Sequence, residues 1–203
     1  HHQISGEALQ KRILDLLRHV GIPDPERRHR AYPHELSGGQ RQRAMIALAV
    51  ANNPRLLIAD EPTTALDPTI QAQILQLFAQ LKKDTPGMGM IFVTHDLAVV
   101  AEIADRVTVM YAGEVVEEGP VAEVFARPRH PYTTALISSV PESGAERLTA
   151  IPGTVPSPRN MPTGCRFAPR CGFATAECES RSPKAEHPAA DRVTRCFRWE
   201  NVT

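Results

Sequence analysis

LSGGQRQR, residues 36–43, joins a turn of small residues to the expected first turn of a helix. Further on, RLLIADEP, residues 55–62, is an apolar run that ends in the carboxylates Asp60 and Glu61. Glycines let a backbone approach a ligand closely, and the free N–H groups at a helix N-terminus attract anions. Acidic residues at the carboxyl end of a buried strand lie where α/β folds bind ligands. The two stretches therefore predict an α/β fold with a site for an anionic ligand.

Hydrophobic periodicity predicts alternating helices and strands on both sides of these stretches. Helices are expected at residues 8–20, 39–52, 68–81, 97–104, 121–125 and 132–140. Apolar runs predict strands at residues 56–59 and 90–93, buried on both faces, and a hairpin of strands 106–111 and 114–117 that turns at Ala112-Gly113. This order favours a layered α/β domain with a parallel core.

The composition changes near residue 128, where we place a domain boundary. Of the 18 prolines in the chain, many follow this point, and residues 141–203 show little periodicity. A segment without an apolar core of its own needs another source of stability. The four cysteines all lie here, at Cys165, Cys171, Cys178 and Cys196, which indicates a local ligand set or local disulfides.

The overall composition suits one globular domain with an appendage. The 203 residues carry 23 basic and 23 acidic side chains, so charge alone gives no reason to expect a nucleic-acid partner. No run approaches the length of a membrane span, and His1-His2 is not the start of a signal peptide. The chain does not begin with Met, so we expect a piece of a longer protein or a lost start, with His1-His2 either native or the end of a tag.

The polar residues of the two stretches have specific chemical uses. The Ser37 hydroxyl adds a donor to the backbone N–H groups of Gly38, Gly39 and Gln40, although the same pattern also describes an ordinary helix N-cap. Asp60 is suited to hold hydrated Mg²⁺, and Glu61 is suited to act as a general base towards a phosphate-attacking water. Two solvated acids at a strand end are the simpler alternative.

Four matches make the chain similar to the ATP-binding-cassette (ABC) ATPases. Residues 36–40 match the family's signature motif, and residues 55–61 match its Walker B strand. PTTALD, residues 62–67, resembles the D-loop with Asp67 as its acid, and VTHD, residues 93–96, places His95 as the switch histidine. The resemblance implies a P-loop NTPase-like nucleotide-binding domain that uses ATP and Mg²⁺. It implies Glu61 and His95 as catalytic residues, and the following as nucleotide-binding residues: Ser37, Gly38, Gly39, Gln40, Asp60 and Asp67.

The family's Walker A motif, G-x-x-x-x-G-K-[ST], is absent from the 203 residues. The chain therefore resembles the C-terminal part of an ABC ATPase. Residues 1–53 are expected to belong to the helical subdomain, residues 54–127 to the core, and residues 128–203 to an irregular, cysteine-rich extension. In the family the signature motif contacts ATP held by the opposite subunit. The resemblance implies ATPase activity for the full-length protein and an inactive fragment on its own.

Other motifs narrow the resemblance to the ATPase subunits of dipeptide, oligopeptide and nickel importers. They are VGIPDP at 20–25, YPHEL at 32–36, GP at 119–120 and PRHPYT at 128–133, followed by the four cysteines. Gln40 departs from the Met that many of these subunits have. The resemblance implies a peripheral protein on the cytoplasmic face of the cell membrane, which powers peptide import. Its expected partners are a second ABC ATPase subunit, transmembrane permease subunits and, indirectly, a substrate-binding protein, with no nucleic acid.

The cysteine spacing, C-x5-C-x6-C-x17-C, leaves the ligand open. Structural zinc sites favour shorter gaps, whereas four thiolates at variable spacing also suit a [4Fe–4S] cluster, which the family resemblance favours. Free thiols or disulfides are further alternatives, although a cytosolic protein keeps thiols reduced. Residues 159–198 carry a net positive charge, either as a basic shell for such a cluster or as ordinary solvated arginines.

Two alternative functions compete with peptide import. A non-transport ABC ATPase of the DNA-repair or translation kind predicts a coiled-coil insertion or a second cassette, and neither is visible in the sequence. A non-catalytic metal-binding or interaction module would contribute only the signature motif, through Ser37 and Gly39, to a partner's site in trans.

Overall fold

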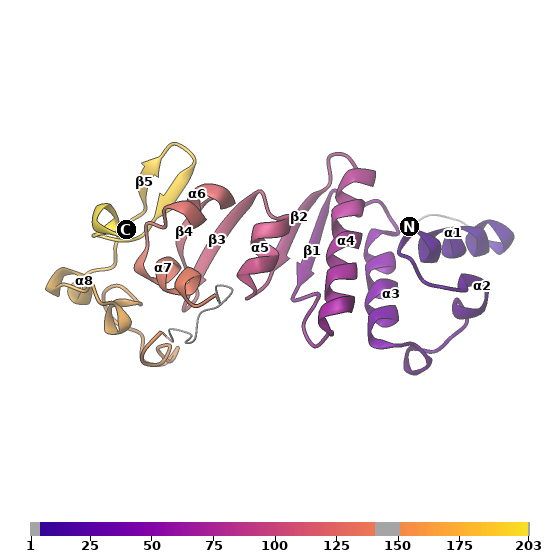
Figure 1. Cartoon of the computed structure of the whole chain (residues 1–203), viewed down its shortest axis with the longest axis horizontal. Helices are drawn as coiled ribbons and strands as arrows, with labels where there is room; N and C mark the ends of the chain where they lie inside the picture. The colour runs from indigo at the N-terminus through magenta and orange to yellow at the C-terminus, as the bar shows by residue number, and fades with distance from the viewer. Residues whose placement is uncertain (1–4, 141–150, 203) are drawn as a thin grey trace. The chain divides into compact units, whose positions relative to one another are not determined.

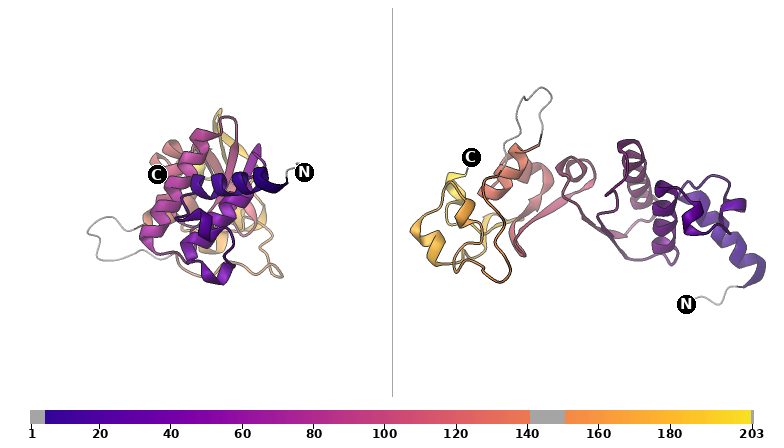
Figure 2. Two further views of the ribbon diagram at one scale, coloured as in Figure 1. Left: turned by 90° about the vertical axis from the view of Figure 1, so that its right-hand side faces the viewer. Right: turned by 90° about the horizontal axis from the view of Figure 1, so that it is seen from below.

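The computed structural model describes residues 5–140 and 151–202. It divides into two compact units, His1–His95 and Asp96–Thr203, whose elements can be followed in two figures (Figure 1, Figure 2). Packing defines these units, so the boundary at residue 128 that composition suggests stays a prediction. Among the described residues, every helix is too short or too polar to cross a membrane.

The first unit places helices against one face of a two-stranded parallel sheet. Its elements in chain order are α1 (Gly6–His19), α2 (Pro25–Arg28), the 3-10 turn η1 (Pro33–Glu35), α3 (Gly38–Val50), β1 (Leu56–Asp60), α4 (Pro68–Asp84) and β2 (Gly89–Val93). Strands β1 and β2 pair in register from Leu56 opposite Gly89 to Asp60 opposite Val93. Helix α4 lies along β1 (Figure 1), and its buried Ile74, Phe78 and Leu81 form a core with Leu57 and Ala59.

The two strands are not buried on both faces, so that part of the prediction is wrong. Leu57 and Ala59 lie in the core, whereas Leu56 and Ile58 on the other face are 51% and 62% exposed. Ile91 and Val93 of β2 are also about half exposed, at 49% and 46%. The reason is that the packed helices of the described unit cover one face of the pair only.

The second unit is built on a four-stranded antiparallel sheet. Its elements are α5 (Leu97–Ile103), β3 (Arg106–Tyr111), β4 (Glu114–Pro120), α6 (Val121–Ala126), α7 (Pro131–Ser138), the 3-10 turn η2 (Ala168–Arg170), α8 (Ala176–Ser180), β5 (Glu186–Ala189), β6 (Arg192–Thr194) and the 3-10 turn η3 (Trp199–Asn201). The strand order is β3-β4-β6-β5. The predicted hairpin is confirmed: Ala112 and Gly113 turn it with φ of 47° and 81°, as tight hairpin turns require.

The C-terminal segment shares a core with this hairpin, so its stability comes from packing on earlier residues. Phe167 is 3% exposed and packs on Tyr111 with ring centroids 5.1 Å apart, and on Tyr132 at 5.4 Å. Strand β6 pairs with β4, so Glu117 lies opposite Thr194. The apolar partners of the segment are therefore residues far back in the chain. Residues 141–150 of the segment lie outside the described residues.

Candidate functional site

The signature stretch forms a fully capped helix start. Ser37 Oγ accepts a hydrogen bond from the Gln40 N–H at 3.3 Å, and Gln40 Oε1 accepts one from the Ser37 N–H at 3.1 Å. This reciprocal capping box orders the N-terminus of α3 and leaves Ser37 and Gly38 exposed to solvent. Ser37 therefore acts as a helix N-cap. This role is compatible with anion binding, because an exposed helix N-terminus still presents the positive end of the helix dipole.

Gly39 brings this stretch against the start of α4. A Cβ at Gly39 would lie 2.8 Å from Ile70 Cγ2, whereas one at Gly38 would lie 3.8 Å from Leu66 Cδ2. Asp67, a predicted nucleotide-binding residue, caps α4: its Oδ1 accepts a hydrogen bond from the Ile70 N–H at 2.9 Å. The signature turn and the Asp67 turn therefore pack directly on each other.

The carboxyl ends of β1 and β2 bring the two candidate catalytic residues together. Asp60 ends β1 opposite Val93, and the Glu61 N–H donates to the Val93 carbonyl at 2.9 Å. His95 follows β2, and its Nδ1 lies 3.2 Å from Glu61 Oε1. Within the described chain, Ser37–Gln40 form no hydrogen bond with Asp60, Glu61 or His95.

The second oxygen of Glu61 has a partner that sequence reasoning did not single out. Thr64 Oγ1 donates a hydrogen bond to Glu61 Oε2 at 2.9 Å. This bond, followed by the contact with His95, lowers the pKa of Glu61 below its ordinary value. Glu61 is therefore ionised at neutral pH, with a side chain that is 47% exposed beside a 77% exposed His95. A solvent-facing carboxylate held in this way can orient a water molecule and accept its proton.

The four cysteines line one apolar pocket in the second unit, together with residues that include His130 and Phe167. All four are free thiols, which disfavours the disulfide alternative. Burial raises the pKa of Cys165, of Cys171 and of Cys196, the last to about 11. Backbone N–H groups point at the sulfurs, as in the 3.3 Å contact from the Arg198 N–H to Cys196 Sγ.

The described residues do not by themselves form the expected metal site. Across the described residues, which include all four cysteines, no group of three or more His, Cys, Asp or Glu side chains could hold a metal ion. Metal ligation would require these thiols to release their protons. The convergence of four thiols on one pocket agrees with a local cysteine set, and it does not identify a ligand.

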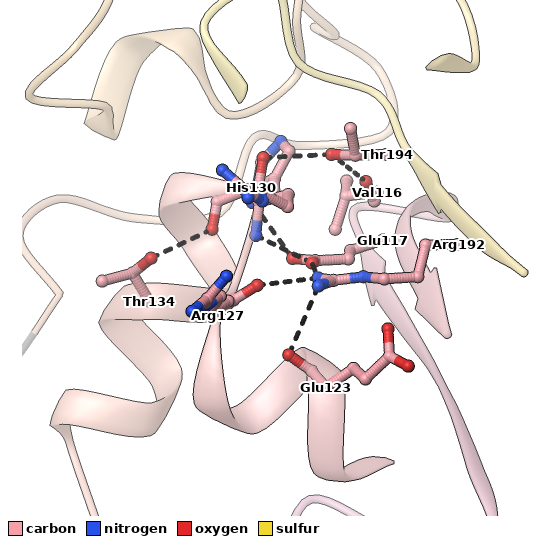
Figure 3. Close-up of polar contacts among 9 residues, drawn as sticks. Val116, Glu117, Glu123, Arg127, His130, Thr134, Arg192 and Thr194 are labelled. Carbon is pink, nitrogen blue, oxygen red and sulfur yellow. Dashed lines mark hydrogen bonds and ion pairs between the residues drawn. The ribbon is translucent and has the colours of Figure 1, made fainter. Parts of the chain in front are cut away.

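A buried ion pair near this pocket was not predicted. Figure 3 shows the ion pair between Glu117 of β4 and Arg192 of β6, in which Arg192 Nη2 lies 2.7 Å from Glu117 Oε1. The carboxylate also accepts the N–H groups of Arg129 at 2.8 Å and of His130 at 3.0 Å. Arg192 is thus part of the interior, while Arg170 holds the carbonyls of Ile151 and Pro152. These arginines are therefore structural rather than solvated.

Two family models match the chain. The ABC transporter model matches residues 1–64, and the model of the oligopeptide/dipeptide transporter C-terminal region matches residues 116–178. A putative peptide import ATP-binding protein of Brucella ovis is 56% identical over 97% of this chain and 60% of its own length. Another, of Brucella abortus, is 52% identical over 90% of this chain and 55% of its own length.

Solved ABC cassettes have a similar fold. The dimeric bacterial ABC transporter cassette MJ0796 is 38% identical with a TM-score of 0.52, covering 60% of this chain and 50% of that one. CbiO1 from Clostridium perfringens is 34% identical with a TM-score of 0.52, covering 62% of this chain and 49% of that one. The chain spans about 60% of the length of the first curated relatives. These matches show that the chain is similar to ATP-binding proteins of the ABC transporter family over residues 1–64, and to the C-terminal region of oligopeptide/dipeptide transporters over residues 116–178.

Proposed function

We propose that the chain is an ATP-hydrolysing subunit that powers peptide import by an ABC transporter. The observation that carries the proposal is Glu61 at the carboxyl end of β1, ionised and held against His95 Nδ1 at 3.2 Å. A pair of this kind at a strand end suits the activation of water for attack on a phosphate. The names of the Brucella relatives, which are putative peptide import ATP-binding proteins, support the choice of cargo.

The proposed reaction assigns a role to each candidate residue. Glu61 accepts a proton from the attacking water as its oxygen bonds to the γ-phosphorus, and the bond to the ADP oxygen breaks. His95 orients the Glu61 carboxylate through Nδ1, and its imidazole contacts the γ-phosphate. Asp60 has the hard oxygen donors that suit Mg²⁺, and a bound Mg²⁺ would neutralise phosphate charge. Ser37, Gly38, Gly39 and Gln40 face the nucleotide of an opposing subunit, and Asp67 orders the turn beside them.

A single substitution tests the role of Glu61 in the assembled transporter. Glu61→Gln keeps the size of the side chain and removes the base, so ATP turnover should fall by about 100-fold or more. Glu102→Gln, an exposed glutamate of α5, is the matched control and should retain turnover. Full turnover in Glu61→Gln would refute the hydrolytic role of this site.

The alternative function is a non-catalytic module that lends its signature motif to a partner in trans. The exposure of Ser37 and Gly38 at the start of α3 supports this alternative, because both residues are accessible to a partner's nucleotide. In that case, substitution of Ser37 lowers the turnover of the complex and Glu61→Gln leaves it unchanged. ATP turnover by the purified chain without any partner would exclude this alternative.

The proposed partners follow from the proposed transport function. A second ABC ATPase subunit, the same or different, would supply the opposing nucleotide site. Transmembrane permease subunits would hold the pair at the cytoplasmic face of the membrane, and a substrate-binding protein would deliver the peptide. Co-purification of the chain with permease subunits in membrane extracts tests this assembly directly.

We also propose that the four cysteines hold a [4Fe–4S] cluster in the protein as it occurs in the cell. What supports this is their convergence on one pocket and the backbone N–H groups directed at their sulfurs. A [4Fe–4S] cluster is larger than a single metal ion, so its cysteine ligands lie farther apart than the ligands of one ion. The lack of a single-ion site among the described residues is therefore compatible with a cluster. Anaerobic purification followed by iron, sulfide and zinc analysis tests the proposal. Zinc alone, or neither metal, would contradict it.

A further inference from the structure

The turn after β1 holds two non-glycine residues in the left-handed region. Glu61 has φ of 45° and Ala65 has φ of 62°. Such a residue is strained in this region, and it persists only where the surrounding contacts hold it in place. The Glu61 N–H donates to the Val93 carbonyl at 2.9 Å, and the Thr64 N–H donates to the Glu61 carbonyl at 3.2 Å. The strained turn is therefore tied to β2 at its first residue and closed by a hydrogen bond within the turn.

This turn places the Thr64 hydroxyl on the carboxylate of Glu61. Thr64 Oγ1 donates to Glu61 Oε2 at 2.9 Å, while His95 Nδ1 lies 3.2 Å from Glu61 Oε1. Each oxygen thus has its own partner, one from the turn after β1 and one from the segment after β2. With both oxygens engaged, rotation of the carboxylate about its terminal bond requires at least one of these contacts to break. A terminal torsion of this kind is otherwise broad and loosely defined.

The turn that carries Thr64 is also held on its C-terminal side, at the start of α4. Three residues after Thr64, Asp67 caps α4 through its 2.9 Å contact with the Ile70 N–H. Leu66 and Ile70 lie against Gly38 and Gly39 of the signature stretch. The hydroxyl of Thr64 therefore sits on a turn that is held between the end of β1 and the start of α3.

We infer that Thr64 is a positioning residue, whose hydroxyl holds the Glu61 carboxylate in the orientation from which it accepts the proton of the attacking water. This inference rests on the proposed hydrolytic function. Thr64 acts through Glu61 and not on the nucleotide, so its loss lowers turnover without weakening the binding of ATP. Loss of a hydrogen bond that orients a charged reacting group is expected to lower the rate about tenfold, which corresponds to about 1.4 kcal/mol.

The test measures kcat and KM for ATP in the assembled transporter that contains this chain. Thr64→Val removes the hydroxyl at constant shape, and kcat should fall about tenfold while KM stays within about twofold. Thr64→Ser restores the donor and should recover most of the lost turnover. Thr69→Val, the same change at another exposed threonine five positions along, is the control and should match the wild type. Melting curves of all variants establish that each is folded.

Two comparisons separate this inference from the proposed function. If Glu61→Gln keeps full turnover, the proposed function fails whatever Thr64 does. If Glu61→Gln loses turnover and Thr64→Val keeps the wild-type kcat, the positioning role is overturned. Thr64→Val should add no further loss to the residual turnover of Glu61→Gln, because its effect runs through Glu61. An additional loss in the double variant, or a Thr64→Ser protein no better than Thr64→Val, also overturns it.

Discussion

His130 shows how burial alone can set the charge of a single residue. The side chain is 1% exposed, and its Nδ1 accepts the Tyr132 N–H at 3.1 Å as the N-cap of α7. Burial lowers the pKa of His130 from 6.5 to about 4. Between these values the unfolded chain binds a proton that the folded chain excludes. The stabilising effect of a neutral His130 is therefore complete above pH 6.5 and is lost as the pH falls towards 4.

We predict that the second unit loses on the order of 3 kcal/mol of stability across this interval through His130. The one Trp of the chain, Trp199, lies in this unit, so its fluorescence in urea titrations at pH 7 and pH 4.5 reports the loss. His130→Asn is the matched variant, because Asn keeps an acceptor for the Tyr132 N–H and does not titrate. The pH dependence of the variant should be shallower. Equal declines in both proteins would contradict the assignment to His130.

At the scale of residues, sequence motifs singled out Glu61 and His95 but did not predict the contacts that hold them. The two residues follow apolar runs, and parallel strands bring their carboxyl ends to one edge. Thr64 lies in the PTTALD motif. Its hydrogen bond to Glu61 forms in a turn where Glu61 has a left-handed φ, and the sequence gives no sign of that conformation. Glu117 and Arg192 are 75 positions apart, so their pairing depends on the full sheet.

Among the elements, helices α3 and α4 depend on the absence of a side chain at Gly39. Gly39→Ala would place a Cβ 2.8 Å from Ile70 Cγ2, so the Ile70 side chain or one of the two helices has to shift. We predict a loss of about 1–3 kcal/mol in the free energy of unfolding of the first unit, measured by circular dichroism in urea. Gly38→Ala is the control, since its Cβ would meet Leu66 at an ordinary 3.8 Å and alanine favours helices.

A second substitution tests whether the loss of stability in Gly39→Ala comes from the contact with Ile70. Ile70→Ala removes the atoms that the new Cβ meets, so the two changes together should cost less than the sum of the separate costs. Additive losses would place the effect of Gly39→Ala elsewhere, for example in the signature turn itself.

The elements differ in how far the sequence predicts them. Long periodic segments such as α1 and α4 lie close to their expected ranges, because their apolar residues recur at helical spacing. Strands β5 and β6, with four and three residues, are too short to show a pattern, and β6 is stabilised by pairing with the distant β4. Alternation in β1 was hidden because its exposed positions, Leu56 and Ile58, are as apolar as its buried ones.

At the scale of the whole molecule, the second unit is stabilised by contacts between segments that lie far apart in sequence. The core around Phe167 joins the hairpin to the cysteine segment, and β6 completes the sheet next to β4. Arg192 connects three places at once: Nη2 lies 2.7 Å from Glu117 Oε1 and 2.8 Å from the Arg127 carbonyl, and Nη1 lies 3.3 Å from the Glu123 carbonyl. The C-terminal segment is thereby fastened to β4, α6 and the residue that comes directly after α6.

We predict that Arg192→Met destabilises the second unit by about 3–5 kcal/mol, the usual cost of leaving a buried charge without its partner. The side chains of Arg192 and Glu117 are 6% and 0% exposed, so water cannot replace the lost ion pair. Glu118→Gln, one position along the same strand, breaks the exposed pair with Arg106, whose side chains are 38% and 48% exposed, and should cost less than about 1 kcal/mol. Trp199 fluorescence in urea measures both variants. Equal small losses would mean that the packing around Phe167, without the ion pair, holds the C-terminal segment in place.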